Sequence, residues 1–342
     1  MSTKIDRRNF LRAVSNLGVA LTAKKLGARL FPLGVGLAAS GTADAAVSVN
    51  TAMAKLLVLD SGGADWLSAY EGGSAVAEVI AETPIPLVKK HIANLRYQDM
   101  LVSVGANISP PLKEWIQLTL ENGQEAIGGV ITSIDYRGNA ATALAFKNAL
   151  ISEVGFPALD ARSRDAVFLR LKLAPEMTAR KKPSGKPPIP PSGSARRKWL
   201  SSNFRLAFEG DSSLSNACKR VSKVDAMTVK QVFNEQYPGE FREPSRNNQY
   251  LEISNLVITL PEMFAEPFYV WHQSFVIEGA SSDNEEKSVT LEYLAQDLKE
   301  TLSTLKLFNV GIISVTPVPT TSASEQVSQV RVEMYCERVS FN

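Results

Sequence analysis

Histidine and cysteine side chains most often carry proton transfer, nucleophilic attack and metal binding, and this chain of 342 residues holds only two of each. They are His91, His272, Cys218 and Cys336. Neither histidine has a second histidine nearby in the sequence, so both are interpreted as exposed or hydrogen-bonded side chains rather than metal ligands. The sequence also offers no Ser-His-Asp, Cys-His or paired-carboxylate motif. It therefore predicts a protein that is not an enzyme, with no catalytic residue, cofactor or metal.

Two smaller features bear on the same question. Cys218 and Cys336 both lie in the C-terminal half, where they are either buried free thiols or, if the protein is exported, one disulfide. The glycine pairs at 62–63 and 72–73 lack the spacing and the lysine of a phosphate-binding loop. Nucleotide binding is therefore disfavoured.

Composition describes a core-forming protein. Hydrophobic residues make up 44% of the chain and charged residues 21%, which excludes a mostly disordered chain, a collagen and a polytopic membrane protein. The formal net charge is +2, so no domain-wide basic field points to specific nucleic-acid binding.

The amino terminus resembles an export signal. Arg7 and Arg8, followed by Phe10 and Leu11, are typical of a twin-arginine motif, and a stretch rich in Ala, Gly, Leu and Val follows at 17–37. If exported by this route, the chain would cross the membrane already folded, as the resemblance implies.

A cleavage site follows this stretch. Ala43 and Ala45 give the small-x-small pattern that a signal peptidase accepts. Lys24, Lys25 and Arg29 interrupt the apolar stretch, however, so an amphipathic N-terminal arm is the alternative. No later window of about 18 residues is uninterruptedly apolar, and no transmembrane span is expected.

An internal repeat can be followed from two tryptophans. Trp115 and Trp271 each stand four residues after a proline and two before a glutamine. Gly123 and Gly279 each lie eight residues after the tryptophan. These matches predict two weakly similar copies of one fold, in which these tryptophans and glycines, together with Gly155 and Gly311, are structural anchors.

The repeat continues downstream. Gly155 within 154–156 matches Gly311 within 310–312, and the alternating strand 166–176 matches 327–337 with an offset about five residues larger. We expect the extra residues in the polar stretch 319–325.

The predicted organisation has four parts: an export signal or arm at 1–45, a first copy at 50–180, a Pro/Lys-rich linker at 181–200 and a second copy at 201–342. Each copy contains many short strands, frequent turns and one helix, at 110–117 and 262–273. A helix is also compatible with 297–305. This pattern predicts a mainly β (α+β) fold of two tandem barrels or sandwiches, each with one flanking helix.

Several segments of the first copy form a recognisable combination: Trp115, Ile131–Asp135, Phe146–Ala149, Phe156–Asp165 and Leu171–Glu176. Together they resemble the tail-tube proteins of contractile phages and phage-like injection particles, which are related in fold to the haemolysin-coregulated protein of type VI secretion. The resemblance covers about residues 55–180 and, more loosely, 203–342.

The resemblance implies a barrel with one flanking helix whose copies join through edge strands into six-membered rings that stack into a hollow tube. From the repeat we infer that three chains would complete a pseudo-hexameric ring. The expected function is therefore structural self-assembly, with the chain itself and other tail or baseplate proteins as partners.

Two features depart from that family, whose members typically have a single copy and no export signal. The alternative function is an exported periplasmic β-sandwich binding module that builds no tube. Localisation follows the same choice: periplasmic if the twin-arginine motif functions, and otherwise cytoplasmic in a phage-like particle.

Overall fold

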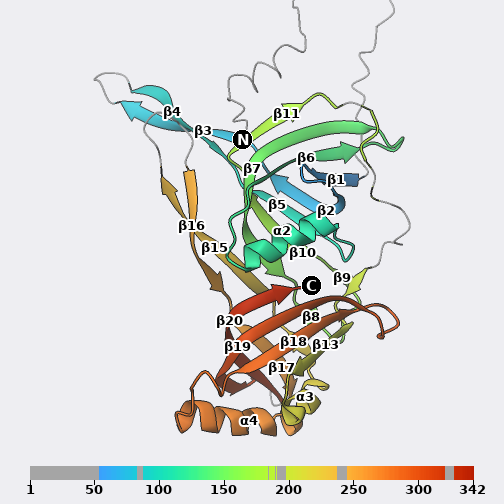
Figure 1. The fold of residues 1–342 in the computed structure, drawn as a ribbon, viewed down its shortest axis with the longest axis vertical. Coiled ribbons are helices and arrows are strands. Elements are labelled where there is room, and N and C mark those ends of the chain that lie inside the picture. Colours follow the sequence, from blue (N-terminus) through green and yellow to red (C-terminus); the bar gives the residue numbers. More distant parts are fainter. Residues whose placement is uncertain are drawn as a thin grey trace, which may run out of the picture. The chain divides into compact units, whose positions relative to one another are not determined.

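Antiparallel strands make up most of the computed structural model, which describes residues 54–82, 88–183, 185–188, 190, 198–236, 245–319 and 327–342 (Figure 1). The prediction of a mainly β fold is confirmed. The predicted export motif (Arg7, Arg8, Phe10, Leu11) and cleavage site (Ala43, Ala45) lie outside the described residues.

The described residues of the first half form one helix and eleven strands. In chain order these are β1 (Ala54–Leu59), β2 (Ala64–Gly72), β3 (Ala75–Glu82), β4 (Lys89–Tyr97), β5 (Met100–Val104), α2 (Pro110–Leu120), β6 (Ile127–Ile134), β7 (Ala140–Phe156), β8 (Leu159–Asp160), β9 (Ala166–Val167), β10 (Leu169–Ala174) and β11 (Met177–Lys181).

The second half adds short helical segments to its strands. They are β12 (Trp199–Leu200), β13 (Phe204–Phe208), α3 (Ser212–Cys218), β14 (Lys223–Val224), β15 (Met227–Gln236), β16 (Ser245–Ile253), β17 (Leu256–Pro261), the 3-10 helix η1 (Glu262–Phe264), α4 (Glu266–His272), the π-helix η2 (Gln273–Ile277), β18 (Lys287–Leu294), β19 (Thr301–Pro317) and β20 (Gln329–Phe341).

The first sheet closes on itself. Its strands are hydrogen-bonded in the order β10-β5-β2-β1-β6-β7, and β7 pairs again with β10, which makes a closed barrel. β10 shows why these segments fold as strands: Leu169, Leu171 and Leu173 are fully buried, whereas Arg170 and Lys172 between them are not. Alternation with period two places every second side chain in the barrel interior.

The second sheet has the same order of strands but is open. β13-β18-β19-β20-β17-β14 follows β1-β6-β7-β10-β5-β2 strand for strand. Among the described residues, β13 and β14 do not pair with each other, and β14 instead pairs with β8 of the first half. The barrel stays open because α3 stands where the first half has the beginning of β2.

Irregularities also recur at matching places in the longest strand of each sheet. Asn148 in β7 and Asn309 in β19 have positive φ angles of 47° and 54°, a conformation that asparagine tolerates better than most residues. Four residues further on, Ser152 and Ile313 are skipped in the register with β10 and β20. Such bulges bend the strand and raise its twist, so β7 and β19 bend alike.

These bulges correct one part of the sequence-based repeat. Counted from the asparagines, Gly311 corresponds to Leu150, and Gly155 corresponds to Thr316, so the match between 154–156 and 310–312 is wrong by five residues. Counted along the chain, most of the extra length of the second half lies between the helix and β18, rather than at 319–325. Short apolar triplets in strands are alike in sequence, which made the wrong match possible.

Two local predictions also fail. Residues 297–305 are not helical: they form a turn with Leu298 at φ 59° and the start of β19. Trp199, placed in the linker from sequence, forms β12 with Leu200 and is 1% exposed. The part of the chain that the structure describes also contains no helix long and apolar enough to cross a membrane.

Candidate assembly interface

A β-hairpin of the second half joins the two halves, because it extends the sheet of the first half. β15 pairs with β16, and the first four residues of β15 also pair with β7, from Met227 opposite Phe156 to Lys230 opposite Glu153. β7 accepts β15 because β6 begins only at Ile127, opposite Ala149, and leaves the end of β7 without a neighbour on that side. This is β-augmentation within one chain.

A buried glutamine on the same hairpin contacts the flanking helix of the first half. Gln231 is 6% exposed, and its Nε2 donates to the carbonyl oxygens of Thr119 at 3.2 Å and Gly123 at 3.0 Å. Carbonyls at the end of a helix lack partners within the helix. Gln231 therefore ties the end of α2 to β15.

The carboxyl terminus completes the contact around α2. Gln117 on α2 donates from Nε2 to the carbonyl oxygen of Phe341 at 2.9 Å and to Oδ1 of Asn342 at 2.6 Å. The ring of Phe341 lies 5.6 Å from that of Phe156 at the end of β7. In Figure 1, α2 accordingly lies between the first barrel and β20.

Aromatic rings fill the core on the second-half side. Trp199 stacks on Tyr293 with ring centroids 4.8 Å apart and meets Phe341 edge-on at 6.4 Å. Burial raises the pKa of the Tyr293 hydroxyl above its ordinary value. Together with the paired short strands β9–β12 and β8–β14, these rings make one continuous hydrophobic core across both halves.

The start of α2 is fixed by a buried carboxylate. Asp65 on β2 is 1% exposed and accepts two hydrogen bonds from Ser109, from the backbone N–H and from the hydroxyl, both at 2.6 Å. Burial raises the pKa of Asp65, and the two Ser109 bonds lower it by less. Asp65 thus links the first barrel to α2, the helix that the second half contacts.

The corresponding hairpin of the first half has no such neighbour. β3 and β4 form a separate two-stranded sheet, and among the described residues they pair only with each other. Their exposed apolar side chains are Val76 at 44%, Val79 at 58%, Ile80 at 53% and Ile92 at 69%. An isolated hairpin is marginally stable in water, so this ribbon is suited to pairing with another sheet.

A free sheet edge exists in the second half. β19 pairs with β18 only up to Val310, opposite Lys287, and continues to Pro317 paired with β20 alone. Within the described residues, one edge of 311–317 therefore carries no strand, at the place where β7 carries β15.

The predicted tryptophan anchors are both in the core. Trp115 on α2 is 1% exposed and donates from Nε1 to the carbonyl oxygen of Glu125 at 2.9 Å. Trp271 on α4 is 8% exposed, and its ring packs edge-on against Phe208 at 5.7 Å. The ammonium group of Lys287 lies 5.5 Å from the Trp271 ring, within cation–π range.

The four predicted glycine anchors have different roles. An added Cβ at Gly311 would overlap the ring of Tyr335 on β20, so any other residue there would require that ring to move. At Gly123 it would overlap a backbone carbonyl of the preceding helical turn, and at Gly155 it would make only an ordinary contact. Gly279 has φ +76°, which favours glycine.

The residues that could carry chemistry do not converge. His91 lies on β4 and His272 at the end of α4. Cys218 and Cys336 are buried free thiols, and burial raises the pKa of each to about 12. The described residues contain no group of three or more His, Cys, Asp and Glu side chains placed to hold a metal ion.

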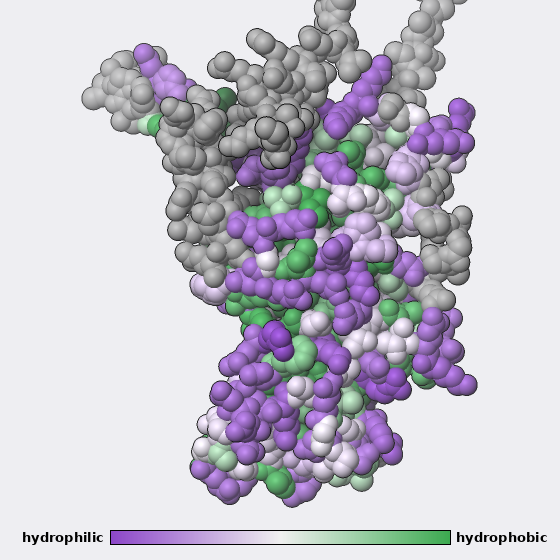
Figure 2. Space-filling model, viewed as in Figure 1, coloured by the Kyte–Doolittle hydropathy of each residue, from purple (hydrophilic) through white to green (hydrophobic). Residues whose placement is uncertain are grey.

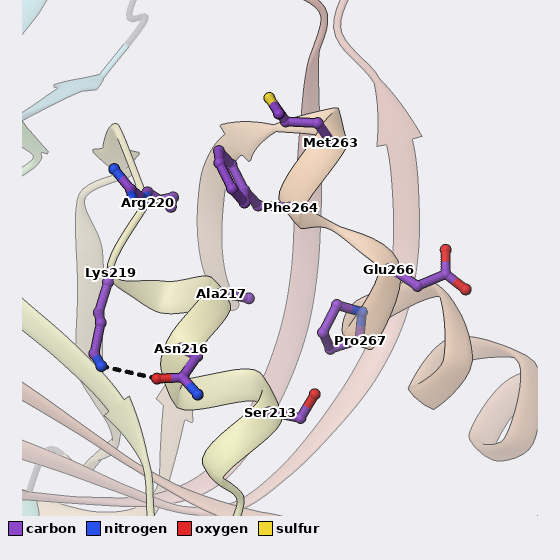
Figure 3. A pocket seen from close by; sticks show the side chains of 9 residues that line it. All are labelled: Ser213, Asn216, Ala217, Lys219, Arg220, Met263, Phe264, Glu266 and Pro267. Carbon is purple, nitrogen blue, oxygen red and sulfur yellow. Dashed lines mark hydrogen bonds between the residues drawn. The ribbon is translucent and has the colours of Figure 1, made fainter.

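A surface pocket of about 630 Å³ lies between α3 and the segment η1–α4 (Figure 3). Arg220 lies over the ring of Phe264 at 5.1 Å, and Lys219 donates from Nζ to Oδ1 of Asn216 at 2.8 Å on its rim. The lining combines cations, apolar side chains and one carboxylate, Glu266, without a converging set of polar groups.

Comparison with known proteins gives structural neighbours only. No family model matches the chain, and no curated protein matches it. Several solved structures are similar in fold, including three with TM-scores of 0.28–0.31. The tube-terminating cap of the anti-feeding prophage is 14% identical, over 46% of this chain and 93% of that one. A sheath-tube complex of the extracellular contractile injection system PVC is 14% identical over 45% and 91%.

The third neighbour is Hcp1 from Flavobacterium johnsoniae, 15% identical over 39% of this chain and 99% of that one. These neighbours come from the same kinds of assembly as the family that the sequence resembles. Each match covers less than half of this chain, and likenesses of this size describe fold alone.

Proposed function

We propose that this protein is a structural, non-catalytic subunit with two copies of a tail-tube-like unit, and that three chains form a pseudo-hexameric ring. Other tail or baseplate proteins are the proposed further partners. The ring would take its place in a tube of the contractile-injection type.

The observation that carries this proposal is the joint between the halves. Two units with the same strand order meet through a hairpin of one, β15–β16, laid on the longest strand of the other, β7. Such a contact is heterologous, because the surface that supplies the hairpin differs from the surface on which the hairpin pairs. Repeated heterologous contacts generate rings when the rotation closes and filaments when it does not.

Two further observations support repetition of this contact. Among the described residues, the hairpin β3–β4 of the first half pairs with no other strand, and residues 311–317 of β19 in the second half have one edge without a strand. A single chain thus has one surface that can supply a hairpin and one edge on which a hairpin can pair. Side chains on the face drawn in Figure 2 are mostly hydrophilic, with hydrophobic ones interspersed.

Native mass spectrometry of the full chain over a hundredfold concentration range tests the proposal, with negative-stain imaging of the same samples. We expect three-chain species that appear as rings or short stacks. A strict monomer at every concentration would contradict self-assembly and would favour the exported binding module instead.

A further inference from the structure

We propose that the contact between chains is made by the β3–β4 hairpin of one copy pairing with the free edge of β19 in a second copy, with Ala75 opposite Val315. This inference rests on the proposed function and specifies its interface. The occupant of the free edge is a second copy of this chain, because the chain already contains the matching contact between its own halves.

The register follows from hydrogen bonds that recur in both hairpins. The backbone N–H of Gln98 donates to the carbonyl of Ser74, and that of Ser254 donates to the carbonyl of Thr228, both at 2.9 Å. Each bond closes the base of its hairpin just before the next barrel strand begins. Ser74 therefore corresponds to Thr228.

The receiving strand is aligned by its bulges. Val229, the residue after Thr228, lies opposite Val154, which stands six residues after Asn148. The residue six after Asn309 is Val315, in the segment of β19 that has one free edge. Applying the internal contact to the unused surfaces therefore places Ala75 opposite Val315.

Exposure of the helix in the second half fits the same arrangement. In the first half, Leu120 stands five residues after Trp115 and is 2% exposed where α2 is enclosed by the second half. In the second half, Val276 stands five residues after Trp271 and is 46% exposed, and Ile277 beside it is 62% exposed. A neighbouring copy on the β19 edge would cover this face as the second half covers α2.

The two contacts differ in one polar residue. Gln231, which binds the helix-end carbonyls in the internal contact, lies two residues after Val229. The residue two after Ala75 is Ala77, which has no side-chain donor. The contact between chains therefore lacks this pair of hydrogen bonds and is the weaker of the two, so rings dissociate on dilution while each chain stays folded.

Engineered cysteines test the register. In the full chain, Ala75→Cys and Val315→Cys are made separately, and the two single variants are mixed and oxidised. We expect disulfide-linked two-chain species only in the mixture, because one chain gives the hairpin and the other receives it. The double variant is expected to form a closed three-chain species. Cys218 and Cys336 are buried with a pKa of about 12, so their thiols stay largely unreactive.

The matched control replaces the receiving cysteine with Met263→Cys, at a residue that is 75% exposed on η1. Mixed with Ala75→Cys, it is expected to give at most a tenth of the cross-linked product. Rings without an Ala75–Val315 cross-link would overturn this interface and leave self-assembly standing. Absence of both rings and cross-links would overturn both proposals.

Discussion

The two hairpins of this protein differ in what they pair with. β15–β16 carries Gln231 into a buried contact and shares its first residues with β7, whereas β3–β4 pairs only with itself among the described residues and exposes Val79, Ile80 and Ile92. The two hairpins occupy corresponding places in the chain: β3–β4 lies between β2 and β5, and β15–β16 lies between β14 and β17. The comparison shows that the same supersecondary unit extends another sheet in one half and, among the described residues, pairs only with itself in the other.

The two barrels differ in a related way. The first closes through β2, and Asp65 on β2 holds the start of α2. The second replaces the start of that strand with α3, and its open side receives β8 from the first half. The first half thus extends the open sheet of the second by one short strand, and one hydrophobic core contains residues of both halves.

Breaking the shared aromatic core is expected to have the largest effect. Trp199→Ala removes a fully buried ring that contacts both Tyr293 and Phe341, and should lower the free energy of unfolding by about 3–5 kcal/mol. Urea denaturation measures the change. The control Tyr136→Ala, at a ring that is 66% exposed, should cost less than about 0.5 kcal/mol. Equal losses would show that Trp199 does not hold the halves together.

Removing the two hydrogen bonds of Gln231 on the β15–β16 hairpin should have the next largest effect on stability. Gln231→Leu keeps the side-chain volume but removes the hydrogen bonds to the carbonyls of Thr119, which keeps the backbone N–H of Asn122 at 3.1 Å, and of Gly123, at a cost of about 1–3 kcal/mol. Lys230→Leu, at the exposed neighbouring position, is the matched control in the same urea assay. If the two variants were equally stable, these hydrogen bonds would be energetically neutral.

The buried carboxylate in the first barrel makes stability depend on pH. Because burial raises the pKa of Asp65 above 3.8, the folded state binds its proton more tightly than the unfolded state does. The free energy of unfolding contributed by Asp65 should therefore fall as the pH rises from below 3.8 through the raised pKa.

Asp65→Asn should remove this pH dependence, because the neutral amide does not titrate. The amide can still bond to both groups of Ser109, so the local structure is kept. Thermal unfolding from pH 3 to 7 measures the pH dependence, with Asp60→Asn at an exposed site as the control. An unchanged slope in Asp65→Asn would assign the pH dependence to another group.

The free hairpin should be the most tolerant site for folding and the most sensitive for assembly. Val79→Lys with Ile92→Glu replaces an exposed cross-strand apolar pair by opposite charges, which keeps the hairpin paired. The unfolding free energy should change by less than about 0.5 kcal/mol. Native mass spectrometry should nevertheless show at least tenfold weaker ring formation. Rings of unchanged strength would show that this apolar face does not contribute to the contact.

Much of the fold could be predicted from local patterns. Alternation of apolar side chains at 169–173 predicted a strand, and the Pro-Trp segments predicted the helices around Trp115 and Trp271. The second half's α3 and the short β14 were missed, because a seven-residue helix and a two-residue strand are too short for a periodic signal. The wrong match of Gly155 with Gly311 has the same origin, since strands of similar composition align equally well when shifted.

The sequence by itself determined the mainly β class, the sparse supply of catalytic side chains and the core positions of Trp115 and Trp271, because these depend on composition and short-range periodicity. Only the tertiary structure decided that β15 lies on β7, that Gln231 binds the end of α2, and that Trp199 belongs to the core rather than to a linker. Each of those contacts joins residues more than thirty positions apart. Backbone edges that meet in space are identical in chemistry along every strand, so no local pattern reveals which edge will receive which hairpin.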